Sequence, residues 1–380
     1  MSSIYFNEDH EKLRATIRRF VETEMIPNEV KWEEEGIFPR EIFTKMGELG
    51  FLGIKFPEEY GGLGLDYFSN VVLLEELSRT SGGVALSLLA HTDISATLVN
   101  LLGTHEQKLK YLSPSITGEK IGALGVTEAN HGSDVAGIET KAIRDGNYYV
   151  VNGSKLYITN GTRADYVILA AKTRPELGYK GISLFIMDTN LPGYRIGKKL
   201  DKLGNRASDT AELSFEDVHI PAENLLGEEN KGFYNIMFNF QGERLAAAVA
   251  GYGSAQKVWE DTITYCNERK AFCQPISKFQ VNTHKLVDML TEIEVGKQMT
   301  YHAAWLYDQK MECVKEVSMA KLYCTEMCFR VLNQALQLHG GAGYMMEYPV
   351  QRFWRDSRLT TIGAGTSEIM KEIIGKRLGL

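Results

Sequence analysis

Residues 148–161 read YYVVNGSKLYITNG, and this stretch decides the kind of fold that the rest of the chain surrounds. It is rich in β-branched and aromatic residues, which favour strands over helices. The Asn152-Gly153 pair is typical of a two-residue hairpin turn, so we expect two strands joined there. Asp145-Gly146 supplies another turn just upstream. The stretch therefore predicts β-structure in the middle of the chain.

The strand pattern extends to both sides of this predicted hairpin. Short apolar or alternating runs predict further strands at residues 166–171, 182–187 and 212–215. The pattern changes near Gly118, and strand signals continue to Leu226. We therefore expect a middle β-domain over residues 121–228.

Helical periodicity occupies both ends of the chain. It runs through residues 8–55, breaks at a glycine-rich loop over residues 57–64, and resumes from Tyr67 to Leu102. After Gly232 it returns, and only Pro275 and Pro349 interrupt it. The order predicts an α+β fold, with an N-terminal α-helical domain over residues 1–120 and a C-terminal four-helix bundle domain over residues 229–380.

Composition excludes several classes of function. The 380 residues carry a formal net charge of −7 without any long run of Lys and Arg, which argues against nucleic-acid binding. We find no apolar window near the roughly 18 residues that a membrane span needs, and no leader-like N-terminus. The five cysteines lack a CxxC pair, which predicts free thiols and no metal site. We expect a cytoplasmic bacterial protein or, alternatively, a mature chain of the mitochondrial matrix.

The usual nucleotide and hydrolase fingerprints are absent from the sequence, but polar, glycine-bearing clusters remain. Hydroxyls and free backbone N–H groups at a strand edge suit a flat heteroaromatic ring such as a flavin, with Tyr157 as a stacking wall. Near the start of the last domain, Arg269 can pair bidentately with a pyrophosphate. Each cluster is also compatible with an ordinary sheet or helix surface, so neither is decisive alone.

In combination the clusters are specific, because the sequence resembles the acyl-CoA dehydrogenase family over essentially its whole length. The resemblance is closest to the isovaleryl-CoA, long-chain and citronellyl-CoA dehydrogenases. The similar motifs lie, in family order, at residues 56–62, 126–128 with 132–134, 152–161, 269–272, 337–344 and 362–368. The resemblance implies FAD as cofactor, a homotetramer, and α,β-dehydrogenation of an acyl-CoA thioester. It also implies an electron-transfer flavoprotein as the electron acceptor.

The resemblance further implies which residues contact FAD. The flavin ring is expected to lie against Leu124, Val126, Thr127, Tyr157 and Thr159, with Ser133 at the phosphates or at the pantetheine arm of the substrate. A second set is expected to reach the FAD of a neighbouring subunit, and it comprises Arg269, Phe272, Gln280, Gln337 and Gly341, with Thr366 and Glu368 at the adenosine half.

Two departures from the family pattern concern loops. Ala129, Asn130 and His131 follow Val-Thr-Glu where the family usually has Pro and Gly, so the loop beside Ser133 is expected to differ in shape. His131 is expected to be a surface residue of this loop. Cys273 replaces the glycine that usually follows the Phe272 position.

The third departure concerns the catalytic base. Removing a proton α to a thioester carbonyl requires a carboxylate or similar group, and most family members place a glutamate where this chain has Ala364. The isovaleryl and long-chain enzymes place it in a Glu-Arg-Leu context, which is matched here by Glu243, Arg244 and Leu245. A helix-surface carboxylate paired with Arg269 or a lysine is the ordinary alternative for Glu243, but the loss at position 364 favours catalysis.

The same comparison bears on the substrate. The family resemblance assigns Arg244 to orientation of the CoA end of the substrate. Small residues at Gly363 and Ala364 leave room beside Cα and Cβ, which suits a branched, cyclic or bulky acyl group. We therefore expect β-hydride transfer to flavin N5 and a 2-enoyl-CoA product from such a substrate.

Asp93 is a second acid to consider, because it falls on the helix that lines the acyl pocket in this family. A buried carboxylate is costly unless it is hydrogen-bonded or used in chemistry. If used, Asp93 would be the base of a 1,4-dehydrogenation of a cyclic enoyl-CoA. A non-catalytic acyl-CoA-binding paralogue or an acyl-CoA oxidase would also be consistent with the resemblance.

Overall fold

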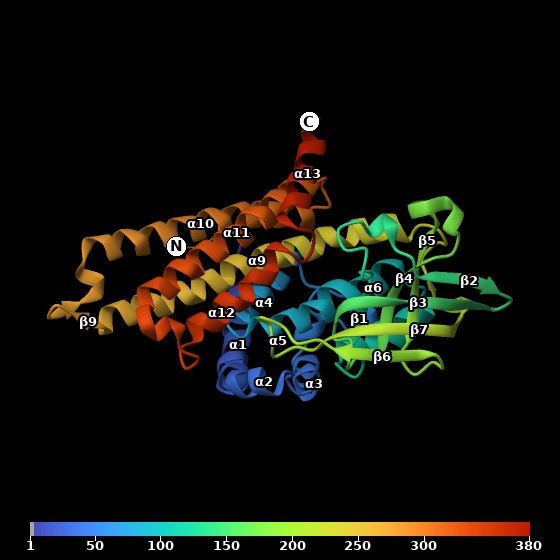
Figure 1. Cartoon of the computed structure of the whole chain (residues 1–380), viewed down its shortest axis with the longest axis horizontal. Helices are drawn as coiled ribbons and strands as arrows, with labels where there is room; N and C mark the ends of the chain where they lie inside the picture. The colour runs from blue at the N-terminus through green and yellow to red at the C-terminus, as the bar shows by residue number, and fades with distance from the viewer. Residues whose placement is uncertain (1–3) are drawn as a thin grey trace.

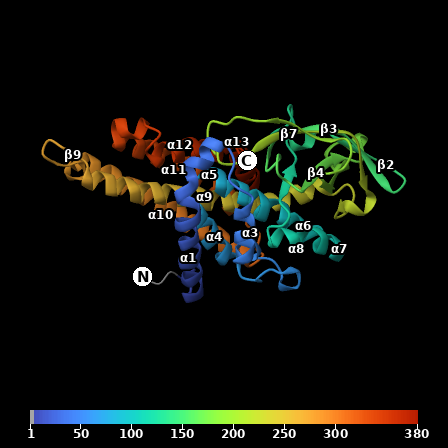
Figure 2. The same cartoon turned by 90° about the horizontal axis from the view of Figure 1, so that it is seen from below.

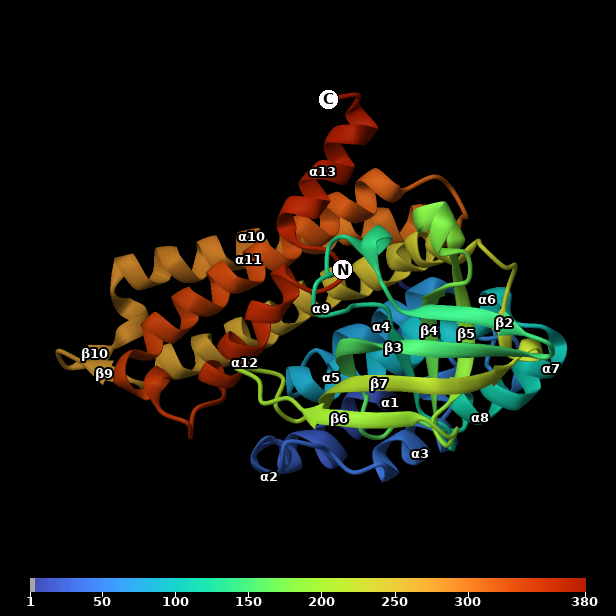
Figure 3. The same ribbon diagram turned by 45° about the vertical axis from the view of Figure 1, so that its right-hand side comes forward.

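The computed structural model describes residues 4–380 and divides them into two helical regions and a sheet (Figure 1). In the view of Figure 3, some of the N-terminal helices lie below the sheet and others lie behind it. This region consists of short helices, namely α1 (Glu8–Phe20), α2 (Glu29–Glu35), α3 (Glu41–Glu48), α4 (Tyr67–Leu77), α5 (Gly82–Leu89), α6 (Thr97–Leu102), α7 (His105–Gln107) and α8 (Ser113–Ile116). A π-helical segment, Ala90–Ala96, joins α5 to α6. Such segments interrupt α-helices frequently at functional sites.

The expectation that no apolar window approaches a membrane span is wrong for residues 82–102. This 21-residue helical run is long and apolar enough to cross a membrane by length and composition alone, although 72% of its apolar 18-residue window is buried inside the protein. The segment contains a buried histidine and a buried aspartate, His91 and Asp93. A core helix of a globular protein can have the same length and composition, and the burial of residues 82–102 is typical of a core helix.

The middle region is a mixed sheet. Its strands are β1 (Gly122–Gly125), β2 (Lys141–Asp145), β3 (Tyr148–Thr159), β4 (Tyr166–Lys172), β5 (Ile182–Asp188), β6 (Tyr194–Lys199), β7 (Thr210–Pro221) and β8 (Leu225–Leu226). The order is β6-β7-β3-β2-β4-β5-β8, with β1 parallel to β4. The central strands β4 and β5 are buried almost throughout, because helices cover one face and the other strands close the other.

The predicted hairpin turn at Asn152-Gly153 is wrong, because β3 runs straight through it. Gly153 lies at a break in the register between β3 and β7, where an added Cβ would come within 2.8 Å of the backbone of Thr140. The glycine therefore serves a β-bulge and a close strand contact rather than a turn. The turn predicted upstream is confirmed, since Asp145 pairs with Tyr148 across a two-residue loop that contains Gly146 at a φ of 57°.

Long helices build the C-terminal region. They are α9 (Gly232–Glu268), α10 (Gln280–Asp308) and α11 (Val314–His339), with the shorter α12 (Pro349–Ser357) and α13 (Ser367–Leu378) packed on α11. A small hairpin of β9 (Lys270–Ala271) and β10 (Gln274–Pro275) joins α9 to α10. Pro349 opens α12, where a missing N–H costs nothing.

Helix α9 connects the parts of the molecule. It begins beside the sheet and ends at the β9–β10 hairpin, at the far end of the bundle from β2 (Figures 1 and 2). Apolar residues near its start pack on the core beneath the sheet, and those further along pack with α4, α10 and α11. Leu124 of β1 contacts both cores. Helix α9 therefore places residues of one chain at two distant positions, one beside the sheet and one beside the β9–β10 hairpin.

Candidate active site

Glu243 lies on α9 with an unsatisfied carboxylate. Its Oε2 atom is buried and has no hydrogen-bond partner among the described residues. Burial raises the pKa of Glu243 to about 7, although the nearby cations of Arg244 and Lys321 act in the opposite direction. Its predicted alternative role, a surface carboxylate paired with Arg269, is wrong, because the two residues stand 26 positions apart on and just beyond one helix, roughly 39 Å along its axis.

The two cations that act on this carboxylate both bind the loop over residues 362–366. Arg244 Nε donates to the carbonyl of Ala364 at 3.4 Å, and Lys321 Nζ donates to the carbonyl of Gly365 at 2.6 Å. Both cations are buried, and burial lowers the pKa of Lys321 to about 8. The structure thus joins Arg244, the neighbour of Glu243 on α9, to Ala364. It also adds Lys321, which the sequence analysis missed because nothing local marks a lysine on a long helix.

Ala364 itself adopts a φ of 55°, a conformation that costs a residue with a Cβ some strain. A Cβ added at Gly363 would meet only the carbonyl of Leu359, at 3.7 Å, so there is space at that position. Thr366 caps α13 by accepting a hydrogen bond from the N–H of Ile369, and Glu368 is exposed in the first turn of that helix. The small side chains at 363 and 364 leave this loop without a carboxylate.

The strand edge that is predicted to face the flavin is built on a buried ion pair. Lys155 Nζ donates to Glu128 at 2.7 Å and to the carbonyl of Val126 at 3.0 Å, and the N–H of Leu156 donates to the carbonyl of Thr127 at 2.9 Å. These contacts fix the segment after β1 against β3. The sequence analysis missed the pair, although a lysine inside a strand that faces a core is a signal for a buried partner.

Tyr157 projects from this edge because β3 is irregular there. The register between β3 and β7 shifts between Lys155 and Ile158, and Tyr157 adopts a φ of 62° with 64% of its surface exposed. Val126 is buried, and Leu124, Thr127 and Thr159 are half-buried around the same edge. A bulge that turns a large ring outward on an otherwise packed sheet leaves a surface suited to a flat ligand.

Ser133 lies in the exposed loop that follows. Glu128 and His131 form an isolated bridge that turns the chain, and Asp134 accepts a hydrogen bond from the N–H of Gly137. His131 is half-buried rather than a surface residue, with Nδ1 3.6 Å from Asp134 and Nε2 3.6 Å from Glu139. The departure at residues 129–131 therefore produces a histidine packed between two carboxylates.

Asp93 is fully paired within the protein. Its Oδ1 accepts from Asn70 Nδ2 at 2.8 Å and from Lys55, and its Oδ2 accepts from Thr92 Oγ1 at 2.8 Å. The side chain is 2% exposed and lies on the π-helical segment that packs on α9. Hydrogen bonds to both oxygens meet the requirement of a buried carboxylate.

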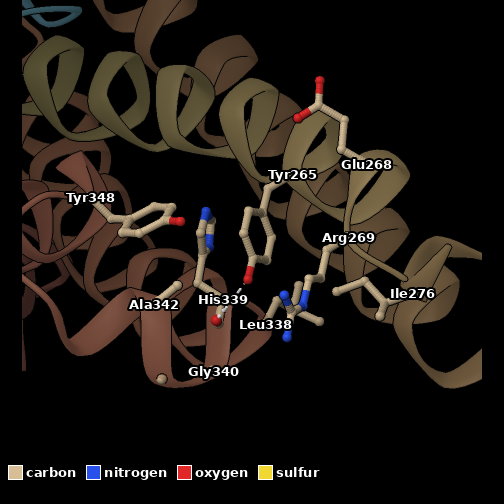
Figure 4. A pocket seen from close by; sticks show the side chains of 10 residues that line it. Tyr265, Glu268, Arg269, Ile276, Leu338, His339, Gly340, Ala342 and Tyr348 are labelled. Carbon is tan, nitrogen blue, oxygen red and sulfur yellow. Dashed lines mark hydrogen bonds between the residues drawn. The ribbon is translucent and has the colours of Figure 1, made fainter. Parts of the chain in front are cut away.

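A pocket of about 750 Å³ lies at the other end of α9 (Figure 4). Tyr265 stacks on His339 with ring centroids 4.2 Å apart, and its hydroxyl donates to the His339 carbonyl at 3.2 Å. Arg269 lines the same pocket without an ion-pair partner among the described residues. A Cβ added at Gly341 would meet nothing within 4 Å, so the backbone there is open to a ligand.

The β9–β10 hairpin beside this pocket is strained and exposed. Its two turn residues, Phe272 and Cys273, have φ values of 50° and 64°, and Phe272 is 90% exposed. Gln280, which opens α10, and Gln337, near the end of α11, are also exposed. The Phe272 ring lies edge-on against the ring of Phe279, with centroids 6.1 Å apart, and most of its surface is open to solvent.

The predicted site residues thus form two groups. One comprises Glu243 and the residues of the sheet edge, and the other comprises Arg269 and the pocket residues beyond the end of α9, which Figure 1 shows far from the sheet. Because of the length of α9, the two groups of one chain do not meet. Among the described residues, no group of three or more His, Cys, Asp or Glu side chains could hold a metal ion.

Comparisons with known proteins agree with this architecture. Descriptions of the N-terminal, middle and C-terminal domains of acyl-CoA dehydrogenase match residues 7–119, 123–218 and 230–379. The structure is similar to that of acyl-CoA dehydrogenase from Geobacillus kaustophilus, with 44% identity, a TM-score of 0.97 and full coverage of both chains. The sequence is 41% identical to mitochondrial isovaleryl-CoA dehydrogenase of Pongo abelii over 97% of this chain and 88% of the relative.

A further relative, also 41% identical over 99% of each chain, is the CarC subunit of the caffeyl-CoA reductase-Etf complex of Acetobacterium woodii. The order of domains, the two groups of predicted site residues and these similarities agree. The chain belongs to the acyl-CoA dehydrogenase family, whose members are FAD-dependent oxidoreductases that act on the CH–CH group of an acyl-CoA.

Proposed function

We propose that the protein catalyses α,β-dehydrogenation of an acyl-CoA, with Glu243 as the base that removes the α-proton and a 2-enoyl-CoA as the product. The observation that carries the proposal is the buried, unpaired Oε2 of Glu243. A general base works best when its pKa lies near the operating pH, and burial brings the pKa of Glu243 to about 7. No carboxylate stands at the usual position, Ala364.

The neighbouring cations support this role. Arg244 and Lys321 donate hydrogen bonds to two carbonyls of the loop over residues 362–366, so they fix the position of its backbone. Their positive charges also keep part of the Glu243 population ionised at neutral pH, as a base must be. Bound FAD supplies the acceptor for the hydride that leaves Cβ.

The residues that would hold FAD fit it as two half-sites. The edge around Thr127 and Tyr157 suits the flat ring, and the open backbone at Gly341 with the free guanidinium of Arg269 suits a pyrophosphate. Because these half-sites lie far apart in one chain, we propose that each FAD is bound between two subunits of a homotetramer. The exposed Phe272 turn would then be covered by the neighbouring subunit.

We propose a branched, cyclic or bulky acyl group as substrate. Gly363 and Ala364 leave space where a glutamate side chain would otherwise stand, and Gly242 precedes the base on α9. We also propose an electron-transfer flavoprotein as the acceptor, since a relative that matches over 99% of each chain is named as a subunit of an Etf complex.

The runner-up is 1,4-dehydrogenation with Asp93 as base. Its three hydrogen-bond donors make it a poor proton acceptor by comparison with Glu243, so we rank it second. A non-catalytic paralogue that only binds acyl-CoA is the third possibility.

One experiment separates the three. The FAD-loaded protein is mixed anaerobically with straight, branched and cyclic acyl-CoAs and with a cyclic enoyl-CoA, and bleaching of the flavin absorbance is followed in wild type, Glu243→Gln and Asp93→Asn. The proposal expects bleaching in wild type, a large loss of rate in Glu243→Gln and retention in Asp93→Asn. Loss in Asp93→Asn alone would transfer the role to Asp93, and absence of bleaching with every acyl-CoA would favour the paralogue.

A further inference from the structure

Two polar side chains near the base are buried without hydrogen-bond partners. Asn239 precedes Glu243 by one turn of α9 and is 3% exposed, and both its amide nitrogen and its amide oxygen lack partners among the described residues. Tyr67 of α4 is 8% exposed, and its buried hydroxyl lies near Asn70 without a well-aligned hydrogen bond. Buried polar groups are nearly always paired, so two such groups indicate a missing partner.

Contacts place these groups around one region beside the base. A Cβ added at Gly242 would lie 3.1 Å from the hydroxyl of Tyr307, and the Tyr307 ring lies 4.8 Å from the ring of Tyr67. On the helical wheel of α9, Asn239 falls between Gly242 and Glu243, about 60° from the first and about 40° from the second. The unpaired amide therefore shares the α9 face that carries the base and approaches the two tyrosines.

The electrostatics of this region favour a neutral partner. Asp93 lies close enough to help raise the pKa of both Tyr67 and Tyr307. Its charge is balanced by Lys55, which donates to it, so the region already holds a closed ion pair. An additional anion would be repelled by Asp93, and an additional cation would compete with Lys55. A neutral group that both donates and accepts hydrogen bonds is neither repelled by Asp93 nor in competition with Lys55.

We propose that the acyl end of the site accepts a group that carries a hydroxyl, a neutral substituent that both donates and accepts hydrogen bonds, held by Asn239 and Tyr67. This inference rests on the proposed dehydrogenase function and names its substrate class. An unsubstituted alkyl chain would leave the buried amide and the buried phenol unpaired, and sites built to bind a substrate hydroxyl discriminate strongly against analogues that lack it.

The test compares matched substrates. Cyclohexanecarboxyl-CoA and its 4-hydroxy derivative, and hexanoyl-CoA and its 5-hydroxy derivative, are assayed for kcat/KM with the FAD-loaded enzyme and an artificial electron acceptor. We expect the wild type to prefer a hydroxylated member by about 10-fold or more. Asn239→Leu, which keeps the volume but removes the amide, is expected to abolish or invert the preference. Asn235→Leu, one turn earlier on α9 and half-buried, is the matched control and should leave the preference unchanged.

Melting temperature provides a readout independent of turnover. If the Asn239 amide is unpaired until a ligand binds, Asn239→Leu should melt at a higher temperature than wild type without acyl-CoA, because an unpaired buried amide is replaced by an apolar side chain. A lower melting temperature would mean that internal water pairs the amide, and it would overturn the inference. Tyr67→Phe, which removes one oxygen, repeats the comparison if Asn239→Leu does not fold.

The outcomes distinguish this inference from the function beneath it. Flavin bleaching by both members of a pair at equal rates refutes the polar acyl pocket and leaves the dehydrogenase intact. Absence of bleaching with any acyl-CoA refutes the dehydrogenase itself. A preference for the unsubstituted member of both pairs overturns the inference directly.

Discussion

Lys155 forms an ion pair with Glu128 at 2.7 Å directly beside the bulge that turns Tyr157 outward. The lysine has no exposed surface, and burial lowers its pKa to about 8 in spite of the carboxylate partner. Glu128 in turn accepts from the N–H groups of Glu139 and Thr140. One buried pair therefore ties together the two segments on which the flavin ring is expected to lie.

Breaking this pair should affect both stability and cofactor binding. Lys155→Met leaves Glu128 buried without its cation, and removing one partner of a buried pair costs about 3–5 kcal/mol. We expect a lower melting temperature together with a lower ratio of flavin to protein absorbance. Lys141→Met, on the exposed side of β2, is the control and should change neither. Full FAD content in Lys155→Met would show that the pair does not position this edge.

The pH dependence of flavin reduction should report Glu243. The base acts only when ionised, so the rate with a saturating acyl-CoA is expected to rise with pH through about 7 and to level off above it. Stopped-flow reduction between pH 5.5 and 9 measures this. A profile without an inflection in that range would assign the proton to another group.

The same carboxylate should make stability depend on pH in the ligand-free protein. Its folded pKa of about 7 lies above the value near 4.3 expected for an unfolded glutamate. Its contribution to stability is therefore fully present below about pH 4.3 and is lost as pH rises through about 7. Glu243→Gln removes this dependence, so thermal melts of the variant, compared with wild type, should gain relative stability from pH 5 to pH 8. A constant difference across that range would contradict the assignment.

Moving the base to the usual position should restore part of the activity. Glu243→Gln is expected to slow flavin reduction by about 10² to 10⁴. The double variant Glu243→Gly with Ala364→Glu supplies a carboxylate from the loop instead and should recover part of the rate. Because the new side chain fills the space beside Cβ, we expect recovery with straight-chain rather than branched substrates. Equal recovery with both would argue against the proposed space at residues 363–364.

Arg269 should couple FAD binding to assembly. Arg269→Ala removes the unpaired guanidinium from the far pocket, so we expect FAD content and the tetrameric fraction to fall together. Absorbance and light scattering on the same sample measure the two. Lys278→Ala, an exposed cation near the same hairpin, controls for charge alone. A variant that remains a tetramer with one FAD per subunit would refute the role.

The sequence by itself determined the order of helices, sheet and helices, because apolar periodicity and turn residues act over a few positions. It also determined the turn at Gly146, where only local backbone conformation matters, and it indicated Glu243 through its local Glu-Arg-Leu context and the alanine at position 364. These features depend on neighbours along the chain, which the sequence displays directly.

Only the tertiary structure decided the features that depend on distant partners. Asn152-Gly153 favours a turn locally, but pairing with β7 and close contact with Thr140 keep the strand continuous. The cation that pairs with Asp93 is Lys55, 38 positions away, and no local pattern indicates it. The pKa of Glu243 arises from burial, which is set by what packs around α9 rather than by α9 itself. Long-range packing and desolvation therefore decided the chemistry that local sequence preferences could only indicate.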